Sequence, residues 1–355
     1  MRFPRTLGLM AAFHLARSYV FSPENIEQIV KEDLPTLYDI YSTQNFSSDV
    51  AASSSYWLSS FLTGFDNEHY VVISHSLANA KGVIYRASTL SLGPPKTYAS
   101  YVATANLSAD AVTTFNISTE DYGFAALSED KVSKIRSWSD HDGVIFDITF
   151  DATSPVIFNG GAGQFSWMNT PANEWGMPAC RTAGSITINN KKVQIDPNRS
   201  FTWYDRQWNY SRDLQRLSSS GSTSGSTGNW TWFEVHFDHS PMKASIWAID
   251  TENPHTRSRF ATVRSDNGSQ QFLPVGFSPD MTKTWVSGAS GVKYPLRWEL
   301  DLPNGDILSI ESVIANQEMV GESASDTAYE GFVSVTGRMF NQVVTGFGIV
   351  EMTSM

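Results

Sequence analysis

The sequence is poor in cysteine, in basic clusters and in long apolar runs, and each shortage excludes a class of protein. Among its 355 residues the one cysteine is Cys180, so we expect neither an internal disulfide nor a structural zinc site. The formal net charge is −11 and lysine and arginine do not cluster, so we expect no nucleic-acid partner. No apolar run reaches the about 20 residues that a membrane span requires, so we expect no stable membrane anchor.

Several catalytic motifs are also missing. The sequence has no G-x-S-x-G elbow, no H-E-x-x-H pair, no P-loop and no dinucleotide fingerprint after a predicted strand. Residues 159–165, NGGAGQF, are rich in glycine but lack the following helix that a phosphate cradle requires. Hydrolase, kinase and dehydrogenase activities therefore lose support, and we expect neither a cofactor nor a metal ion.

The first residues are typical of a secretory leader. Arg2 and Arg5 precede a mostly apolar run over residues 7–16, and the predicted leader spans residues 1–21. An ordinary N-terminal helix is the alternative. Seven Asn-x-Ser/Thr sequons, each a glycan acceptor in the secretory pathway, agree with a leader and lie at Asn45, Asn106, Asn116, Asn198, Asn209, Asn229 and Asn267. We therefore expect a secreted or vesicular glycoprotein.

Strand signals dominate the rest of the chain. Residues 22–44 read as a short helical segment, because Ser22 and Pro23 resemble an N-cap and first helical position. Segments that alternate apolar and polar residues, separated by turns, then follow at 69–77, 82–90, 97–107, 143–152, 184–196, 230–239, 243–250, 259–265, 296–302, 306–315, 331–340 and 343–353. This pattern predicts an all-β protein with two antiparallel β-barrel or sandwich domains, over 45–195 and 196–355.

The stretch TWYDRQWNYS, residues 202–211, contains the main catalytic candidate. It places Asp205 among the rings of Trp203, Tyr204 and Trp208, and beside Arg206. A carboxyl group that loses its hydration among rings has a raised pKa, so Asp205 is a candidate Brønsted acid. The alternative is a structural anchor paired with a base. A direct pair with Arg206 is disfavoured, because adjacent residues on a strand point to opposite faces.

A second candidate wall lies in WTWFEVHFD, residues 230–238. Alternation puts Trp230, Trp232, Glu234 and His236 on one face, and this mixture of indoles and titratable groups is typical of an organic-ligand pocket. A solvent-exposed polar face is the alternative. Glu330, in AYEGF, is either a pocket group or a structural one.

The candidate site therefore has two sets of residues. We predict catalytic roles for Asp205, His236 and Glu330, and substrate contacts for Trp203, Tyr204, Arg206, Trp208, Trp230, Trp232 and Glu234.

Four segments together resemble the lipocalin-like carotenoid 1,2-hydratase superfamily. They are residues 184–209, GSITINNKKVQIDPNRSFTWYDRQWN; residues 229–238, NWTWFEVHFD; the C-terminal residues 329–353; and the strand SSSYWLSSFL, residues 53–62. The family often has His where Arg206 stands and Gly where Asn209 stands, so carotenoid hydration itself is not carried over. The resemblance implies two lipocalin-like β-domains with a hydrophobic pocket. Its secreted fungal branch implies cofactor-free cyclases of secondary metabolism, including Diels–Alder and hetero-Diels–Alder catalysts.

These observations lead to one expected function and two alternatives. We expect a cofactor-independent cyclase of the pericyclase type that acts on a hydrophobic polyketide- or terpenoid-derived intermediate. The first alternative is an acid-promoted hydratase, isomerase or epoxide cyclase with Asp205 as proton donor. The second is a carrier that binds a lipophilic metabolite without changing it.

Overall fold

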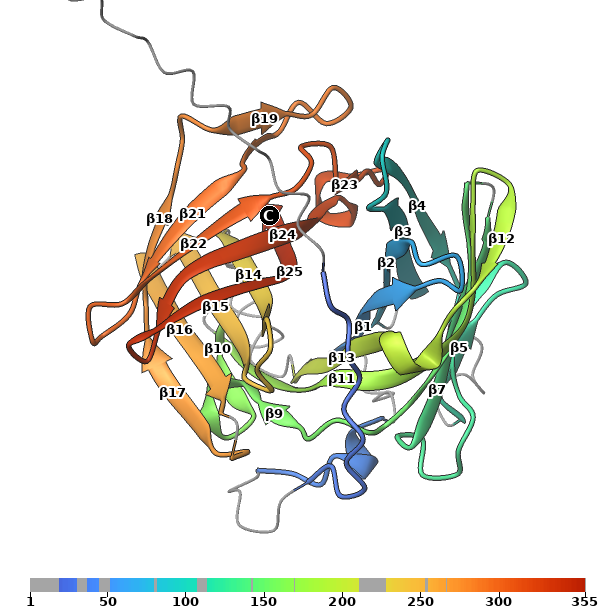
Figure 1. The fold of residues 1–355 in the computed structure, drawn as a ribbon, viewed down its shortest axis with the longest axis horizontal. Helices are drawn as coiled ribbons and strands as arrows, with labels where there is room; N and C mark the ends of the chain where they lie inside the picture. The colour runs from blue at the N-terminus through green and yellow to red at the C-terminus, as the bar shows by residue number, and fades with distance from the viewer. Residues whose placement is uncertain are drawn as a thin grey trace, which may run out of the picture.

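The fold consists of two large antiparallel sheets that lie side by side (Figure 1). It is known from a computed structural model, which describes residues 19–30, 37–44, 52–79, 82–106, 114–141, 143–168, 170–210, 228–252, 255–265 and 267–354.

Over the described residues, the first sheet has thirteen strands in the order β4-β3-β2-β1-β13-β11-β8-β7-β6-β5, with β9, β10 and β12 also paired to β11. The strands are β1 (Ala52–Thr63), β2 (His69–Asn79), β3 (Gly82–Ser91), β4 (Thr97–Ala105), β5 (Asn116–Ser118), β6 (Tyr122–Ala126), β7 (Lys134–His141), β8 (Val144–Asp151), β9 (Ile157–Phe158), β10 (Gln164–Trp167), β11 (Thr170–Ile188), β12 (Lys191–Gln194) and β13 (Phe201–Tyr210).

The second sheet has ten strands within the described ranges, in the order β17-β16-β15-β14-β25-β24-β22-β21-β18, with β23 paired to β24. A separate pair, β19 and β20, lies beside it. The strands are β14 (Gly228–Phe237), β15 (Lys243–Glu252), β16 (His255–Arg264), β17 (Gln270–Pro274), β18 (Gly276–Pro279), β19 (Thr284–Val286), β20 (Lys293–Pro295), β21 (Arg297–Asp301), β22 (Ile307–Ser312), β23 (Glu318–Met319), β24 (Ala328–Met339) and β25 (Gln342–Ser354).

The all-β prediction is confirmed, and each of the twelve alternating segments contains a strand. The helical elements among the described residues are the short 3-10 turns η1 (Tyr41–Gln44), η2 (Asn159–Gly161), η3 (Pro197–Arg199) and η4 (Ala324–Asp326). The two sheets do not divide at residue 195, because β13 lies beyond it in the chain and pairs with β1 and β11 of the first sheet. Strand pairing therefore moves the change of sheet to between β13 and β14.

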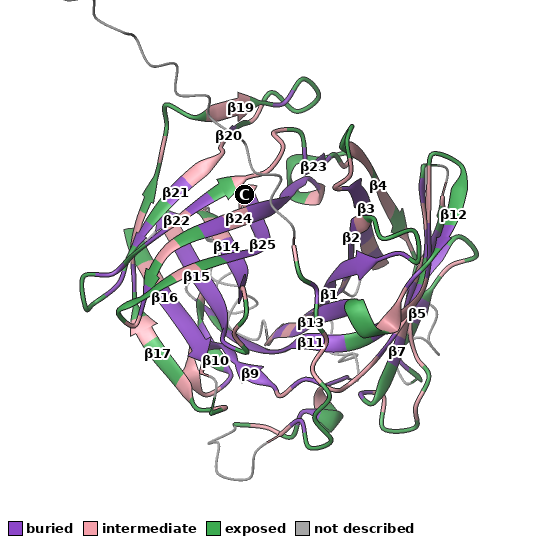
Figure 2. Ribbon diagram, in the orientation of Figure 1, coloured by how far each residue is buried: buried purple, intermediate pink, exposed green. Residues whose placement is uncertain are grey.

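Apolar residues form three layers. One face of each sheet packs onto that sheet's own core, which includes Tyr204 in the first sheet and Phe233 in the second. The opposite faces of both sheets meet in a middle layer, where Trp57 and Trp203 of the first sheet join Trp232 of the second. The strands on both sides of this layer are largely buried (Figure 2). The middle layer is therefore enclosed by the two sheets, and a site that lies between them is shielded from solvent.

The predicted helical segment over residues 22–44 is wrong in its described parts. Residues 19–30 run as an extended strap, and residues 37–44 contain only the single turn η1. Glu24 N donates to Ala179 O at 2.9 Å and Ile26 N to Thr153 O at 2.8 Å. Backbone groups that bond to neighbouring strands are not available for a helix, so these pairings decide the conformation.

The predicted leader lies mostly outside the described residues. Of residues 1–21, the structure describes Tyr19 to Phe21, and Phe21 is buried against Phe61, Phe201 and Phe347. A leader that ended at residue 21 would remove this core ring, and the leader itself stays a prediction. Among the described helices, none has the length and apolar character to span a membrane.

Glu24 in the strap joins the two sheets. Its Oε1 accepts a hydrogen bond from Arg264 Nη2 of β16 at 2.5 Å, and its Oε2 accepts one from Ser154 Oγ, next to β8, at 2.6 Å. The Arg264 side chain is 3% exposed. A guanidinium this deeply buried depends on its carboxylate partner.

We predict that Glu24→Ala lowers the free energy of unfolding by about 3–5 kcal/mol, because it leaves the buried Arg264 charge without its partner. Denaturant titration measures the change. Glu311→Ala is the control, since its partner Lys283 is 47% exposed and such pairs contribute at most about 1 kcal/mol. Equal losses of unfolding free energy in the two variants would contradict a stabilising role for the Glu24–Arg264 ion pair.

Candidate active site

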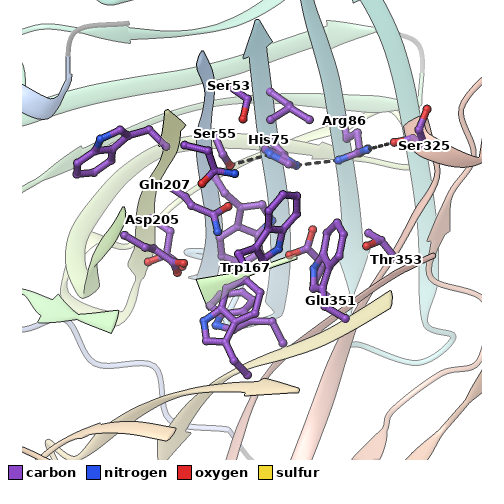
Figure 3. A pocket seen from close by; sticks show the side chains of 18 of the residues that line it. Ser53, Ser55, His75, Arg86, Trp167, Asp205, Gln207, Ser325, Glu351 and Thr353 are labelled. Atoms are coloured by element: carbon purple, nitrogen blue, oxygen red, sulfur yellow. Dashed lines mark hydrogen bonds between the residues drawn. The ribbon is translucent and has the colours of Figure 1, made fainter. Parts of the chain in front are cut away.

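A pocket of about 140 Å³ lies between the two sheets and is lined largely by indole rings (Figure 3). Six of the eleven tryptophans of the chain line it, namely Trp57, Trp167, Trp208, Trp230, Trp232 and Trp247. An engineered protein cavity of roughly 150 Å³ binds benzene, so this pocket has room for at least one six-membered ring.

Cross-strand register places one row of site residues on the first sheet. Asp205 of β13 is paired with Gly176 of β11 on one side and with Trp57 of β1 on the other. Trp57 is paired with His75 of β2, which is paired with Arg86 of β3. Residues paired across neighbouring strands share a face of the sheet. Asp205, Trp57, His75 and Arg86 therefore all reach the pocket.

A second row faces the first from the other sheet. Trp247 of β15, Trp232 of β14, Glu351 of β25 and Glu330 of β24 are paired in that order. Trp247, Trp232 and Glu351 line the pocket, and Glu330 lies fully buried behind it. Trp57 Nε1 donates a hydrogen bond to Glu330 Oε2 at 2.7 Å, which joins the two rows.

Asp205 lies in an environment that favours its neutral form. It is 5% exposed, and its Oδ1 has no hydrogen-bond partner among the described residues. Burial raises the pKa of Asp205 well above its usual range; the Trp203 side chain opposes this rise, and the charge of Glu351 adds to it. A Cβ atom on Gly176 would overlap Asp205 Oδ1, so glycine at this position makes room for the carboxyl group.

Glu174 of β11 lies in the same wall and is also neutral. Asn159 Nδ2 donates to Glu174 Oε1 at 2.7 Å, and Oε2 has no partner in the described part of the chain. Burial raises the pKa of Glu174 well above its usual range, and any ionisation of Asp205 would raise it further. This wall thus carries two carboxyl groups that hold protons in preference to ionising.

His75 and Arg86 form a fixed chain of hydrogen bonds beside the pocket (Figure 3). Arg86 Nη1 lies 3.1 Å from His75 Nδ1, and Ser55 Oγ lies 2.9 Å from His75 Nε2. Arginine can only donate, so Nδ1 accepts and Nε2 carries the ring proton. Burial and the Arg86 charge hold the pKa of His75 well below its usual range. Arg86 also donates to the carbonyl oxygens of Ser325 and Asp326 in η4, at the edge of the pocket.

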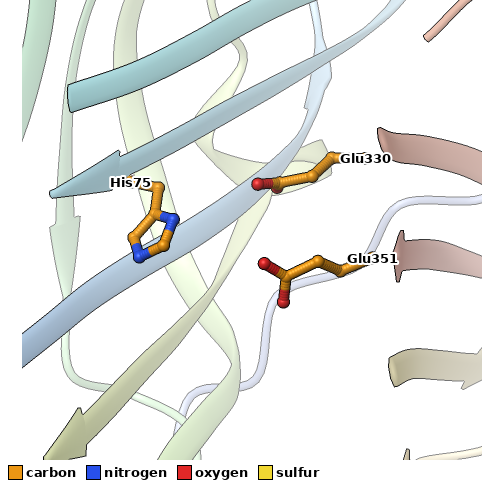
Figure 4. A group of neighbouring side chains, drawn as sticks. All are labelled: His75, Glu330 and Glu351. Atoms are coloured by element: carbon orange, nitrogen blue, oxygen red, sulfur yellow. The ribbon is translucent and has the colours of Figure 1, made fainter. Parts of the chain in front are cut away.

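His75, Glu330 and Glu351 point toward one another (Figure 4), with one potential metal-ligand atom of each within 4.8 Å of the others. The histidine does not fit a metal ion, because Arg86 occupies the lone pair of Nδ1 and Nε2 carries a proton. A permanent cation next to the cluster also opposes a second one. The cluster is therefore a pair of carboxyl groups beside a neutral imidazole.

The two carboxyl groups of this pair differ in protonation. Burial and the charge of Glu351 raise the pKa of Glu330 to about 8. Burial also raises the pKa of Glu351, and the Arg86 charge opposes that rise. Glu351 therefore loses its proton first, and Glu330 keeps its proton at neutral pH.

The sequence-predicted residues separate into three groups. Asp205, Trp208, Trp230 and Trp232 line the pocket, with Glu330 directly behind it. Trp203 and Glu234 are buried in the middle layer but do not line the pocket; Glu234 Oε1 accepts from Ser59 Oγ at 2.6 Å. Tyr204, Arg206 and His236 lie elsewhere.

Tyr204 and Arg206 do not line the pocket, although Trp208 at the end of the same strand does. Both side chains point into the core of the first sheet, on the face opposite Asp205. Tyr204 Oη donates to Gln44 Oε1 at 2.9 Å, and Arg206 Nε donates to Thr43 O at 2.9 Å. The prediction that these two side chains contact substrate is therefore corrected: they anchor the turn η1.

His236 lies farther along β14 and does not share a pocket with Asp205. It is buried among the rings of Phe61, Phe201 and Phe347, and neither ring nitrogen has a partner among the described residues. It lines a different cleft, of about 420 Å³. Its predicted catalytic role beside Asp205 is not supported by this position.

Sequence reasoning missed His75, Arg86, Glu174 and Glu351. His75 and Glu351 each stand in a predicted alternating segment, at 69–77 and 343–353, in register with its buried apolar positions. The signal that could have identified these two residues is a titratable residue among the apolar positions of an alternating strand. Glu174 had no such signal in the sequence, because its strand contains prolines and glycines and shows no alternation.

The sequons lie in three kinds of position. Asn106, Asn116, Asn198, Asn229 and Asn267 are exposed, and Asn45 lies outside the described residues. Asn209 is half-buried and lines the pocket, where a glycan would compete with a ligand. Glycosylation of the exposed sites stays a prediction.

Comparisons with known proteins agree with the fold and add named relatives. The model of the AttH-like family matches residues 96–355. The chain is 41% identical over 337 residues to kievitone hydratase of Fusarium solani subsp. phaseoli, covering 95% of this chain and 91% of the relative. It is 33% identical over 345 residues to the dehydratase asqC of Emericella nidulans, covering 94% of each.

Two solved structures resemble the chain over most of its length. The crystal structure of kievitone hydratase from Nectria haematococca has a TM-score of 0.85 and 37% identity, covering 95% of this chain and 98% of that one. The structure of CghA with Sch210972 has a TM-score of 0.56 and 10% identity, covering 95% and 99%, and shows a shared fold alone.

We predict that Glu330→Gln removes a pH dependence of folding stability. Between pH 4.5 and about 8 the folded protein keeps a proton on Glu330 that the unfolded chain has lost. The protonated Glu330 therefore contributes its full stabilisation of the folded state below pH 4.5. This stabilisation is lost as pH rises through about 8, at a rate of at most about 1.4 kcal/mol per pH unit. Free energies of unfolding from denaturant titrations across this range measure the slope. The exposed Glu299→Gln should keep it, and identical slopes for wild type and Glu330→Gln would refute the assignment.

Proposed function

The chain belongs to the AttH-like family, and we propose that it is a hydro-lyase that adds water to an uncharged, unsaturated hydrophobic molecule with Asp205 as proton donor. Its relatives at 41% and 33% identity are a hydratase and a dehydratase, so the protein is an enzyme of secondary metabolism of the hydratase, dehydratase or cyclase kind. A Diels–Alder reaction, the first expectation from the sequence, is not singled out by these relatives.

The observation that supports the proposal is a buried carboxyl group, Asp205, that faces the pocket and favours its protonated form. Asp205 lines the pocket, is buried, and has an Oδ1 without a hydrogen-bond partner among the described residues. Because burial raises its pKa, Asp205 favours its protonated form and is suited to give a proton to a bound alkene. A pericyclase would need hydrogen-bond donors there, but it would not need this stored proton.

The tryptophans favour a flat substrate in which positive charge develops. Protonation of an alkene places positive charge on carbon, and indole faces stabilise a cation within about 6 Å. Trp57 and Trp232 meet edge to face with ring centroids 5.0 Å apart, and Trp167 and Trp230 do so at 5.3 Å. The ionised Glu351 in the lining disfavours an anionic substrate, and Arg86 already donates to His75, Ser325 and Asp326. A polyketide or terpenoid origin of the substrate and a secretory location stay predictions.

We predict that Asp205→Asn lowers kcat for hydration by about 100- to 10,000-fold, because the amide keeps its size and hydrogen bonds but has no proton to give. Product formation is measured by mass spectrometry with kievitone and a panel of uncharged aromatic alkenes. Asp151→Asn is the control, since Asp151 is exposed in β8 and pairs with Lys134 at the surface.

The outcome separates the three functions. A loss of only a few fold in Asp205→Asn would favour a cycloaddition in a shaped pocket. A wild-type protein that binds panel members, as tryptophan fluorescence shows, and returns every one unaltered would favour a carrier.

We also predict that Gly176→Ala lowers kcat by at least about 10-fold, because its Cβ atom displaces the Asp205 carboxyl group and misplaced catalytic groups lose rate. Gly288→Ala is the matched control, since a Cβ atom there meets no atom within 4 Å. The same turnover assay and a thermal melt check both variants. A fully active Gly176→Ala protein would show that the position of Asp205 is not critical.

A further inference from the structure

We propose that Glu351 is the general base of this site, so that the pocket has an acid wall at Asp205 and a base wall at Glu351. The inference rests on the proposed function, because a base of this kind is needed when water is added to an alkene or removed from an alcohol.

The geometry puts the two groups on opposite sheets around one pocket. Asp205 belongs to β13 of the first sheet and Glu351 to β25 of the second, and both line the pocket. Indole rings lie between them (Figure 3). A flat molecule held by these rings would therefore meet the two carboxyl groups on different sides.

The charges around the two walls differ. Of the described residues that line the pocket, Arg86 is the one permanent cation. Its charge favours the ionised forms of Glu351 and Glu330, but it is not among the influences on Asp205 or Glu174. The Glu351 wall therefore keeps a negative charge, whereas the Asp205 wall stays neutral. Carboxyl groups whose environments separate their protonation states are suited to acid and base roles.

Every titratable group around Glu351 is consistent with this division. Glu330 of β24 holds its proton, His75 of β2 is neutral, and Arg86 of β3 is the cation. Burial also raises the pKa of Asp205 of β13, Glu174 of β11 and Glu234 of β14, and the charge of Glu351 adds to the rise at Asp205 and Glu174. Because these groups favour their neutral forms, the negative charge resides on Glu351.

Glu330 is a positioning residue and not the base. It does not line the pocket, and Trp57 Nε1 donates to its Oε2 at 2.7 Å. Two carboxyl groups this close do not both ionise. Glu330 therefore keeps the proton, and Glu351, which lines the pocket, carries the charge.

The chemical step balances with these two groups. In hydration, the Asp205 proton adds to one alkene carbon, the oxygen of a water molecule bonds to the other carbon, and Glu351 takes a proton from that water. The alkene gains one water, Asp205 becomes a carboxylate and Glu351 an acid. A proton then passes from Glu351 to Asp205 through solvent when the product leaves.

The same resting state also serves dehydration. There Asp205 protonates the departing hydroxyl group, Glu351 removes a proton from the neighbouring carbon, the C–O bond breaks and a C=C bond forms. The substrate group that lies against each wall thus decides whether the resting enzyme hydrates or dehydrates that substrate. The substrate class is an uncharged ring compound with an alkene or a tertiary alcohol that reaches across the pocket.

The test compares Glu351→Gln with Glu330→Gln in the hydration assay. We expect Glu351→Gln to lower kcat by more than about 30-fold with little change in KM, because only the base is lost. Glu330→Gln should lose less than about 10-fold, and the exposed Glu299→Gln should match wild type. A Glu351→Gln protein within about 30-fold of wild-type kcat would overturn the proposal.

Two further measurements keep the test decisive. In wild type, kcat should fall on the acid side as Glu351 takes up a proton, with the limb above pH 4.5. A kcat that stays flat down to pH 4.5 would overturn the base role, even if Glu351→Gln fails to fold. Asp205→Asn separates the two ideas: if it is inactive while Glu351→Gln is active, hydration stands and the base assignment fails. If Asp205→Asn is active, the proposed function itself fails.

Discussion

Cross-strand register is the constraint on which the site depends. One row of paired positions carries Asp205, Trp57, His75 and Arg86 across the first sheet, and a second carries Trp232, Glu351 and Glu330 across the other. A slip of one residue in any strand would turn its side chains to the opposite face. The buried apolar faces of both sheets prevent such slips, so the same packing that stabilises the fold also positions the reacting groups.

Desolvation gives this arrangement its chemistry. Asp205, Glu174, Glu234, Glu330 and Glu351 are all buried around the middle layer, and burial raises the pKa of each one. Five buried carboxylates beside one guanidinium would be very costly. Most of them therefore keep their protons, and the position of Arg86 decides which one ionises. In the proposed mechanism, the placement of a single cation on β3 thus separates the acid Asp205 from the base Glu351.

Much of the fold could be predicted from local patterns. Period-two alternation identified strands at 69–77 and 343–353, because a half-polar strand shows its period directly. The first part of β11, before the predicted segment 184–196, was not predicted, because Pro171, Gly176 and Pro178 interrupt any alternation there. Pairing on several sides holds it extended. The strap at residues 19–30 resembles a helix start locally, but its partners are distant strands. Long-range pairings of this kind leave no local signal.

The candidate site was predicted only in part, for a related reason. Asp205 was found because it is surrounded by rings in the sequence itself, and Trp230 and Trp232 because they alternate with core residues. His75, Arg86 and Glu351 come from three strands, and no sequence spacing links them to Asp205.

The two-sheet frame persists where most of the sequence changes. CghA shares this fold with a TM-score of 0.56 at only 10% identity, so the sheets persist while most side chains change. Fold and function separate because chemistry resides in a few side chains on a fixed frame. Here those side chains point inward from strands that are buried on both faces. Replacing a charged residue in either row changes the protonation of the others without altering strand pairing. The proposed acid and base roles therefore depend on a few charged positions in the two rows and not on the strand pairing itself.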